Sequence, residues 1–294
     1  MRTSVIIPCY NHERFIGEAI RSVLEQDHTD LELVVVDDGS TDGSIRVIED
    51  TMAAFEGAAA RLQRQSNRGA HAAINAGIEL SSGDCIALLN SDDAYAAARI
   101  SQIVEKAAGR ELFFIFTGID FIDEAGNHLT SEHPHSRWYQ RITENRATAP
   151  TLGFSLLQDN ISVTSGNFAF SRSLYDQLGG FSGYEFCHDW DFLMRATRLV
   201  EPDFLEAPLL HYRAHDSNTT HSLRHVQEEE VSGALNRFLQ LCADEGAPNP
   251  LAPCPQNWPS FFETYARKTT FHFDSEPIAA YIDPPDLASS SKTS

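Results

Sequence analysis

The sequence contains few basic residues for its length. Its 294 residues include 22 Lys and Arg against 42 Asp and Glu, which gives a formal net charge of -20 at pH 7. No dense block of Lys and Arg offsets the negative charge, so nucleic acids and anionic membrane surfaces are poor partners. A small or neutral polar substrate fits better, and an anionic one would need a metal ion or a local Arg to reverse the field.

Long apolar runs and cysteine patterns are also missing. No stretch reaches the roughly 20 apolar residues of a membrane span, and the first apolar run is too short for a signal peptide. The five cysteines are odd in number and none has CxxC spacing, so we expect free thiols and no disulfide framework or cysteine zinc site. We expect a cytoplasmic protein, with contact to the inner membrane through a partner or acceptor left open.

The composition is that of a globular protein, with 42% apolar and 22% charged residues, and apolar strands alternate with helical patterns. The predicted strands are residues 4–7, 31–36, 61–65, 85–89 and 112–117. The predicted helices between them are residues 15–24, 45–52, 70–80 and 96–108. This alternation predicts an α/β fold with a mainly parallel sheet flanked by helices.

The second half of the chain has a weaker pattern. Residues 120–157 predict a long loop or a helix over the site, and residues 165–170 predict another strand. A helix is expected to begin near Asp189, and residues 226–242 read as an amphipathic helix. A Pro-rich segment and a Ser-rich end, predicted to be disordered, follow.

Polar residues stand where three of the predicted strands end, at residues 8–11, 37–40 and 90–93. In open parallel sheets the ligand lies beyond the carboxyl ends of the strands. The sequence therefore predicts a binding site at this edge, before any family is considered.

Two nucleotide-binding motifs are absent. No G-x-G-x-x-G follows the first strand and no G-x-x-x-x-G-K-[ST] occurs, which excludes the dinucleotide and P-loop phosphate cradles. Asp92 and Asp93 offer a different chemistry, since adjacent carboxylates suit a hard divalent cation shared with substrate phosphates. The same residues are common helix N-caps, so the pair by itself leaves both interpretations open.

Taken together, these segments resemble the family-2 glycosyltransferases, which have the GT-A fold with a Rossmann-like central sheet. The matching segments, in the family's order, are residues 4–11, 34–42, 67–69, 89–93, 166–170, 179–181 and 188–192. They cover roughly residues 3–220. The resemblance implies an inverting transfer of a sugar from a nucleoside-diphosphate sugar to a hydroxyl acceptor, assisted by Mn²⁺ or Mg²⁺.

The resemblance also implies roles for donor-side residues. Pro8, Tyr10 and Asn11 would hold the nucleotide base, and Asp38 would accept a hydrogen bond from it. Asn67 and Arg68 would lie near the donor, with Arg68 meeting a phosphate.

Three residues are expected around the metal ion. Asp92 would touch the ribose or the donor sugar, and Asp93 would bind the metal. His215 would complete the metal shell or meet the diphosphate. Asn90 stands where the family often has Asp, which leaves open whether Asp92 or Asp93 is the ligand.

On the acceptor side, Asp189 is the expected general base. Asp191 competes for that role, but residues two apart on a helix do not share a face, and the motif register favours Asp189. Trp190 would stack on an acceptor sugar or lie in the core. His188 occupies the position where the family usually has Glu, and this departure motivates the alternative of a non-catalytic sugar-nucleotide-binding regulatory or scaffold protein.

Histidines recur at i,i+4 spacing, first as His211 and His215 and then as His221 and His225. On a helix this spacing would place two imidazoles on one face. A zinc site needs a further ligand, and no anchoring motif supplies one. We expect His221 and His225 to be surface residues.

The expected organisation is a glycosyltransferase domain at residues 1–220 and a helical and Pro-rich extension at residues 221–294. The first divides into a nucleotide-sugar half, 1–118, and an acceptor and catalytic half, 119–220. The expected partners are a UDP-sugar and a glycan, protein or lipid-linked acceptor, with a homodimer contact through the extension left open.

Overall fold

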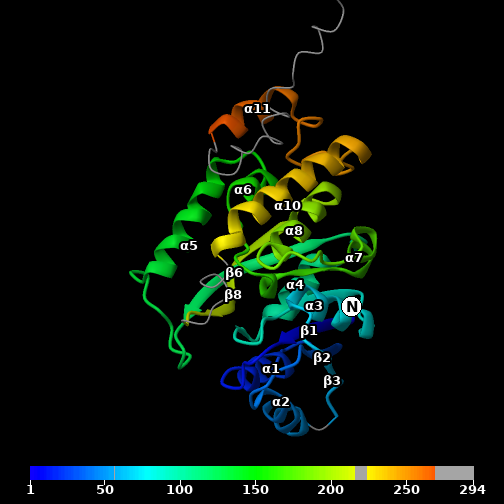
Figure 1. Cartoon of the computed structure of the whole chain (residues 1–294), viewed down its shortest axis with the longest axis vertical. Coiled ribbons are helices and arrows are strands. Elements are labelled where there is room, and N and C mark those ends of the chain that lie inside the picture. The colour runs from blue at the N-terminus through cyan, green and yellow to red at the C-terminus, as the bar shows by residue number, and fades with distance from the viewer. Residues whose placement is uncertain (56, 216–223, 269–294) are drawn as a thin grey trace, which may run out of the picture.

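The structure, a computed structural model, describes residues 1–55, 57–215 and 224–268. Its centre is one eight-stranded sheet (Figure 1). The strands are β1 (Thr3–Cys9), β2 (Leu31–Asp37), β3 (Ala60–Arg64), β4 (Cys85–Leu88), β5 (Ala94–Tyr95), β6 (Phe114–Ile122), β7 (Ala169–Ser171) and β8 (Asp203–Arg213). Their order across the sheet is β3-β2-β1-β4-β7-β6-β8-β5.

Most neighbouring strands of the sheet are parallel. β3, β2, β1 and β4 pair in parallel, as do β6 and β8. β7 is antiparallel to both β4 and β6, and β5 is antiparallel to β8. The predicted α/β fold with a mainly parallel sheet is therefore confirmed.

Helices follow the strands along the chain. The α-helices are α1 (Ile16–Leu24), α2 (Ser44–Ala53), α3 (Ala70–Leu80), α4 (Arg99–Ala107), α5 (Pro134–Asn145), α6 (Leu152–Gln158), α7 (Arg172–Leu178), α8 (His188–Leu199), α10 (Arg224–Glu245) and α11 (Pro259–Lys268). The 3-10 helices are η1 (Arg146–Thr148) and η2 (Ser165–Asn167). The helix predicted over residues 70–80 has these bounds in the structure.

The two faces of the sheet bury two apolar layers. Side chains alternate along a strand, so Val5 and Ile7 of β1 pack with α1 residues such as Ile20, whereas Ile6 packs with Ile74 of α3. Full burial of each such side chain contributes roughly 1.5–3 kcal/mol. Both layers are needed because a parallel sheet is apolar on both faces.

Several predicted elements differ in the structure. β6 runs on to Ile122 instead of ending at residue 117, and α5 and α6 follow it. Residues 165–170 form η2 and the start of β7, where one strand was expected. His211 lies in β8 and therefore not on a helix face, because pairing with β6 holds this segment extended.

The helix α10 packs on α8, and its apolar face joins the core cluster on that side of the sheet. Val231, Leu235 and Phe238 are at most 1% exposed. The described part of the C-terminal extension thus shares a core with α8. His221 and the Ser-rich end fall outside the described residues.

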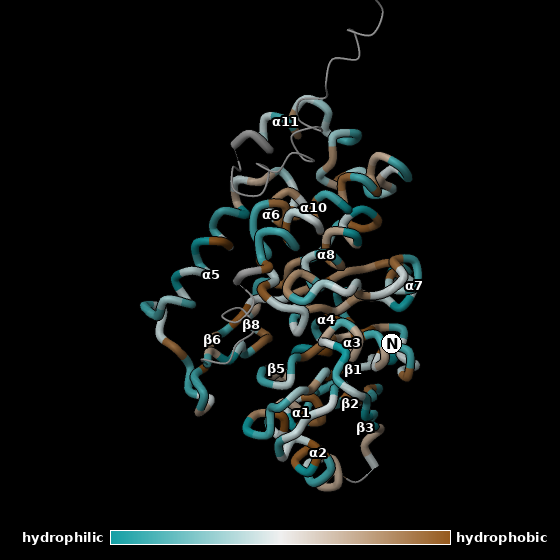
Figure 2. The backbone as a smooth tube through the Cα atoms, in the orientation of Figure 1, coloured by the Kyte–Doolittle hydropathy of each residue, from teal (hydrophilic) through white to brown (hydrophobic). Residues whose placement is uncertain are grey.

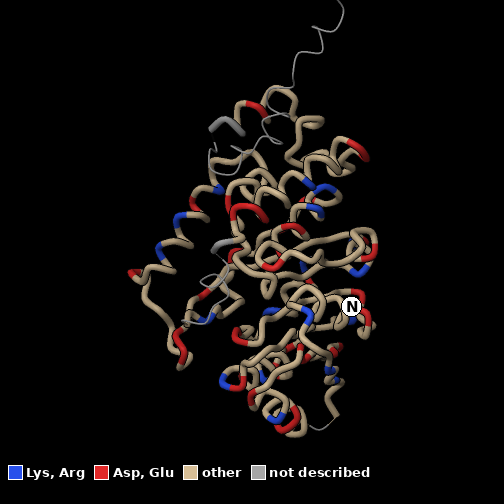
Figure 3. The backbone as a smooth tube through the Cα atoms, viewed as in Figure 1, with Lys and Arg blue, Asp and Glu red and all other residues tan. Residues whose placement is uncertain are grey.

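The surface matches the charge pattern of the sequence. Figure 2 shows hydrophilic residues along most of α5, and Figure 3 shows Lys and Arg scattered over the described chain without a dense group. Among the described residues, no helix combines the length and apolarity that crossing a membrane requires.

Candidate functional site

The polar clusters meet at one edge of the sheet. β1 lies between β2 and β4 and is parallel to both, so the loops that follow the three strands are neighbours. Backbone hydrogen bonds join two of these ends, because Asp38 N donates to Cys9 O at 2.8 Å. The three clusters predicted from the strand ends therefore lie along a common edge.

Asp38 organises the loop that carries Asn67 and Arg68. Its Oδ1 accepts from Arg68 N at 2.9 Å and from Gln65 Nε2 at 2.7 Å, and its Oδ2 accepts from Gly69 N at 2.8 Å. A carboxylate has about four acceptor sites, and three of them are used by these contacts in a residue that is 3% exposed. The side chains of Asn67 and Arg68 are exposed.

The loop after β1 is held by Asn11. This residue has a φ of 54°, its N donates to Ser40 Oγ at 2.9 Å, and its Oδ1 accepts from Thr41 N at 2.8 Å. Tyr10 beside it is 46% exposed, whereas Pro8 is partly buried within β1. The Tyr10 ring is therefore accessible to a ligand at the strand ends.

Residues 90–93 are here called the acidic loop. In this loop the Asp92 carboxylate lies close to two histidines. His215 Nε2 lies 3.0 Å from Asp92 Oδ2, and His12 Nε2 lies 4.0 Å from the same oxygen. Burial by itself would raise the pKa of Asp92, but the His215 hydrogen bond and the nearby imidazoles hold it below the ordinary value. The arrangement joins the segment after β8 to the acidic loop.

Asp93 points into the protein. It is 1% exposed, its Oδ1 accepts from Arg213 N at 2.9 Å, and its Oδ2 is buried without a hydrogen-bond partner. Burial and the charge of Asp92 raise the pKa of Asp93 well above its usual range. Arg213 also donates from Nε to Asp92 O at 2.8 Å, so this buried Arg holds both acidic residues.

Asp189 lies in the first turn of α8 and is half-buried. Asn160 Nδ2 donates to its Oδ2 at 3.0 Å, and Trp190 N donates to its Oδ1 at 2.6 Å. Burial raises the pKa of Asp189 to about 7, against the lowering effect of these two hydrogen bonds. A carboxylate with this pKa can accept a proton near neutral pH.

Residues 160–167, the bridging segment, connect Asp189 to the acidic loop. Asn160 contacts Asp189 at one end, and Thr164 Oγ1 accepts from Asn90 Nδ2 at 2.6 Å at the other. A Cβ on Gly166 would lie 2.8 Å from Asn90 N, so only glycine allows this close approach. The bridging segment therefore links the predicted base to the acidic loop through hydrogen bonds at its two ends.

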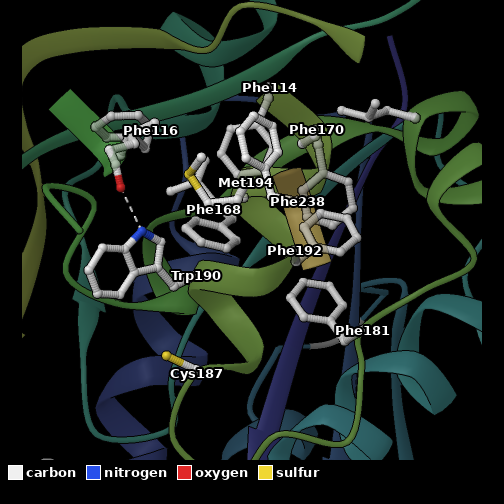
Figure 4. Close-up of a cluster of buried hydrophobic side chains, with 14 of the residues drawn as sticks. Phe114, Phe116, Phe168, Phe170, Phe181, Cys187, Trp190, Phe192, Met194 and Phe238 are labelled. Carbon is white, nitrogen blue, oxygen red and sulfur yellow. Dashed lines mark hydrogen bonds between the residues drawn. The ribbon is translucent and has the colours of Figure 1, made fainter. Parts of the chain in front are cut away.

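Trp190 and Asp191 face away from solvent. Trp190 is 7% exposed in the aromatic core of Figure 4, where its Nε1 donates to Leu156 O at 2.7 Å. Asp191 is 0% exposed and forms ion pairs with Arg195 at 2.8 Å and with Arg237 at 3.1 Å. Of the two interpretations of Trp190, its burial favours a place in the core. Asp191 is buried too, and its carboxylate is paired with two arginines.

His188, in the position where the family usually has Glu, is also held inside. Burial lowers the pKa of His188 to about 4, so the ring is neutral at pH 7. A carboxylate reaches this helix start from α10 instead. Glu230 accepts from Glu185 N at 2.9 Å, Phe186 N at 2.7 Å and Cys187 N at 2.9 Å.

Sequence reasoning missed four residues that build this site: His12, Asn160, Arg213 and Glu230. Arg213 stands two positions before His215, and Asn160 stands in the region without periodicity. Neither residue type nor spacing distinguishes them from surface polar residues, because their partners are far away in the chain.

Comparisons with known proteins show the family to which the chain belongs. A family model described as glycosyl transferase family 2 matches residues 4–179. A curated relative, an uncharacterised glycosyltransferase of Nostoc sp. (strain PCC 7120), is 30% identical over 78% of this chain and 70% of its own length.

Two solved structures share the fold. Staphylococcus aureus TarS (residues 1–349) in complex with UDP-GlcNAc has a TM-score of 0.65 and 19% identity, over 91% of this chain and 73% of that one. The mannosyltransferase PcManGT of Pyrobaculum calidifontis in complex with GDP-Man and Mn²⁺ has a TM-score of 0.61 and 19% identity, over 95% of this chain and 77% of that one. At this identity the likeness concerns the fold, and it confirms the predicted GT-A architecture.

Proposed function

Because the chain belongs to glycosyl transferase family 2, we propose that it moves a sugar from a nucleoside diphosphate to a hydroxyl acceptor, with inversion at the anomeric carbon. The observation that carries the proposal is the bridging segment, which holds Asp189 at one end and the acidic loop at the other. A base and a diphosphate-binding edge are the two parts that this reaction needs.

In the proposed reaction, the Asp189 carboxylate takes the proton of the acceptor hydroxyl. The acceptor oxygen forms a bond to the anomeric carbon from the face opposite the leaving group. The bond between that carbon and the diphosphate oxygen breaks, and the nucleoside diphosphate leaves with the electron pair. Asn160 and Trp190 N orient the carboxylate through their hydrogen bonds.

The donor would lie along the strand ends. Tyr10 and Pro8 would pack beside the base, with Asn11 shaping the loop and the remaining acceptor site of Asp38 facing the base. Arg68, exposed beside Asn67, would meet a phosphate. A UDP-sugar is the first donor to test, since the TarS complexes contain UDP-GlcNAc or UDP.

The residues present fit a divalent cation. Asp92 and His215 offer a carboxylate and an imidazole 3.0 Å apart, and we propose them as the protein ligands in place of the Asp93 expected from the sequence. When bound, Mn²⁺ or Mg²⁺ would neutralise the charge that develops on the leaving diphosphate. Asp93 would instead hold the backbone of Arg213.

The acceptor is proposed only by class, as a glycan, a protein or a lipid-linked sugar. Trp190 and Asp191 are buried, so we do not assign them to acceptor binding. We also propose a homodimer through the C-terminal helices. Sedimentation of the full chain would test it by measuring the oligomeric state.

The test is a panel of UDP-, GDP- and dTDP-sugars incubated with the protein and Mn²⁺, with release of nucleoside diphosphate as the readout. We expect metal-dependent release that EDTA removes. Asp189→Asn should keep donor binding in calorimetry and lose on the order of 10²–10⁴-fold in turnover. The matched control Asp50→Asn, at an exposed helix position, should behave as wild type.

Two results would contradict the proposal. Absence of both release and metal-dependent binding for the whole panel would remove the donor site. A product that keeps the donor's anomeric configuration, seen by proton NMR, would remove the inverting mechanism.

A further inference from the structure

A cluster of two histidines and one aspartate lies on the β6–β8 pair and takes no part in the donor site. Asp120 comes from β6, His128 from the hairpin that follows β6, and His211 from β8. Each side chain offers one ligand atom, and these atoms all lie within 4.8 Å of one another. The β6 hairpin and β8 bring together three residues that can bind a metal, of which His211 is distant in the sequence from the other two.

Backbone pairing fixes the position of all three residues. Asp120 is in register with His211 across the parallel β6–β8 pair. His128 returns to β6 through a tight turn, where Asp123 Oδ1 accepts from Ala125 N at 2.8 Å and from Asn127 N at 2.9 Å. The side chains consequently meet without a long flexible loop.

The three side chains already contact one another. His128 Nδ1 lies 2.6 Å from Asp120 Oδ2, and the ring centroids of His128 and His211 are 5.5 Å apart. We propose that Asp120, His128 and His211 form a zinc-binding site. Two imidazoles and a carboxylate are a known type of zinc donor set, and the metal would displace the proton shared by His128 and Asp120.

The geometry is compatible with tetrahedral coordination. Zinc bonds of ~2.0–2.1 Å place ligand atoms about 3.3 Å apart. The ligand atoms lie within 4.8 Å of one another, so shifts of about 1–2 Å through side-chain rotation bring them to that spacing. His128 is the most exposed of the three, with 61% of its side chain accessible, so fewer packing contacts oppose its adjustment.

A pocket beside the cluster leaves room for a fourth ligand. It has a volume of about 330 Å³ and is lined by His128 and His211 together with Glu18 and Arg21 of α1 and Glu25 directly after it. A water molecule needs roughly 30 Å³, so solvent or a small anion fits at the open coordination position.

The proposed zinc would support the acidic loop from a distance. It would tie the β6 hairpin to β8 at His211, two positions before Arg213, which holds Asp92 O and Asp93 Oδ1. Ala94, directly after the acidic loop, is in register with His211 across the β5–β8 pair. The site is therefore a structural clamp, and its existence does not depend on the proposed transferase reaction.

The test titrates the metal-stripped full chain with Zn²⁺ and with Co²⁺, without nucleotide. We expect one tight Zn²⁺ per chain and, with Co²⁺, the intense visible absorption of a tetrahedral site. His128→Asn and His211→Gln should weaken binding on the order of 100-fold. The controls His28→Asn, at a histidine outside the cluster, and Asp92→Asn should bind Zn²⁺ as wild type does.

A thermal measurement separates binding from folding. His128 is exposed, so His128→Asn should melt at the wild-type temperature without metal, and added Zn²⁺ should raise the melting temperature of the wild type only. The proposal is overturned if wild type binds no Zn²⁺, if His128→Asn binds it equally, or if Asp92→Asn alone loses it, which would place the metal at the donor site.

Discussion

At the residue scale, Asp189 experiences two opposing influences. The N-terminus of α8 and two hydrogen bonds favour the charged carboxylate, whereas burial favours the neutral acid. Burial outweighs the others, so the pKa rises to about 7. Sequence position alone predicts only the helix dipole, which lowers the basicity of Asp189.

The pH dependence of kcat/KM should follow this pKa. A general base acts in its deprotonated form, so we expect a plateau above pH 7 and a fall of about tenfold per pH unit below it. Asn160 hydrogen-bonds to the charged form, so Asn160→Ala should raise the pKa and move the acidic limb to higher pH. An acidic limb that stays in place in Asn160→Ala, or persists in Asp189→Asn, would assign the titration to another group.

Asp92 and Asp93 should differ in their effect on metal dependence. Asp92→Asn should raise the Mn²⁺ concentration for half-maximal donor hydrolysis by tenfold or more, on the order expected for loss of a ligand. Asp93→Asn keeps an oxygen for Arg213 N and should leave that concentration within about threefold. The reverse result would make Asp93 the ligand, as the sequence first suggested.

At the element scale, α10 holds the start of α8. The Glu230 carboxylate accepts three backbone N–H groups of residues 185–187, which precede the helix. Arg237 from the same helix pairs with Asp191. These N–H groups belong to the segment that leads into α8, so a carboxylate of α10 fixes the backbone directly before the helix.

Glu230→Ala should therefore affect catalysis indirectly, by displacing the start of α8 and with it Asp189. We expect a loss of about 1–2 kcal/mol in stability and a lower kcat, with unchanged donor affinity, because the donor edge is formed by other elements. Glu229→Ala, at an exposed neighbouring position, is the matched control. Loss of donor affinity without loss of kcat would place Glu230 in donor binding instead.

At the scale of the whole molecule, the sheet and the C-terminal helix α10 share one hydrophobic core. Phe238 of α10 is buried in the same cluster as Phe170, Phe181 and Phe192, and Figure 4 shows these rings together. The sheet supplies one wall of this cluster and α8 supplies another. The helix α8 is thus packed between the sheet and α10.

Truncation of Phe238 should destabilise the whole chain. We expect Phe238→Ala to cost about 3–5 kcal/mol and to keep a single unfolding transition in denaturant. Phe261→Ala, at a residue that is 40% exposed, should cost much less. Two separate transitions, with activity lost only in the second, would indicate that residues 224–268 fold independently of the sheet.

Much of the architecture was predictable because it depends on local patterns. Apolar runs and helical spacing predicted β1 to β4 and α1 to α4, and polar strand ends predicted the edge of the site. β8 was not predicted, because its inward and outward residues follow no clean alternation. The strand predicted over residues 165–170 was too long at its start, because residues 165–167 form η2 and β7 pairs only over residues 169–171.

The sequence by itself determined the α/β class, the family and the edge at which Asp38 and Asp92 would lie, since these depend on periodicity and on motifs within short segments. Only the tertiary structure decided that Asp92 faces His215 and that Asp93 turns inward toward Arg213. It alone placed Asp120 beside His211. Strand register and hairpin closure join residues far apart in the chain, and no local pattern encodes which of them will meet.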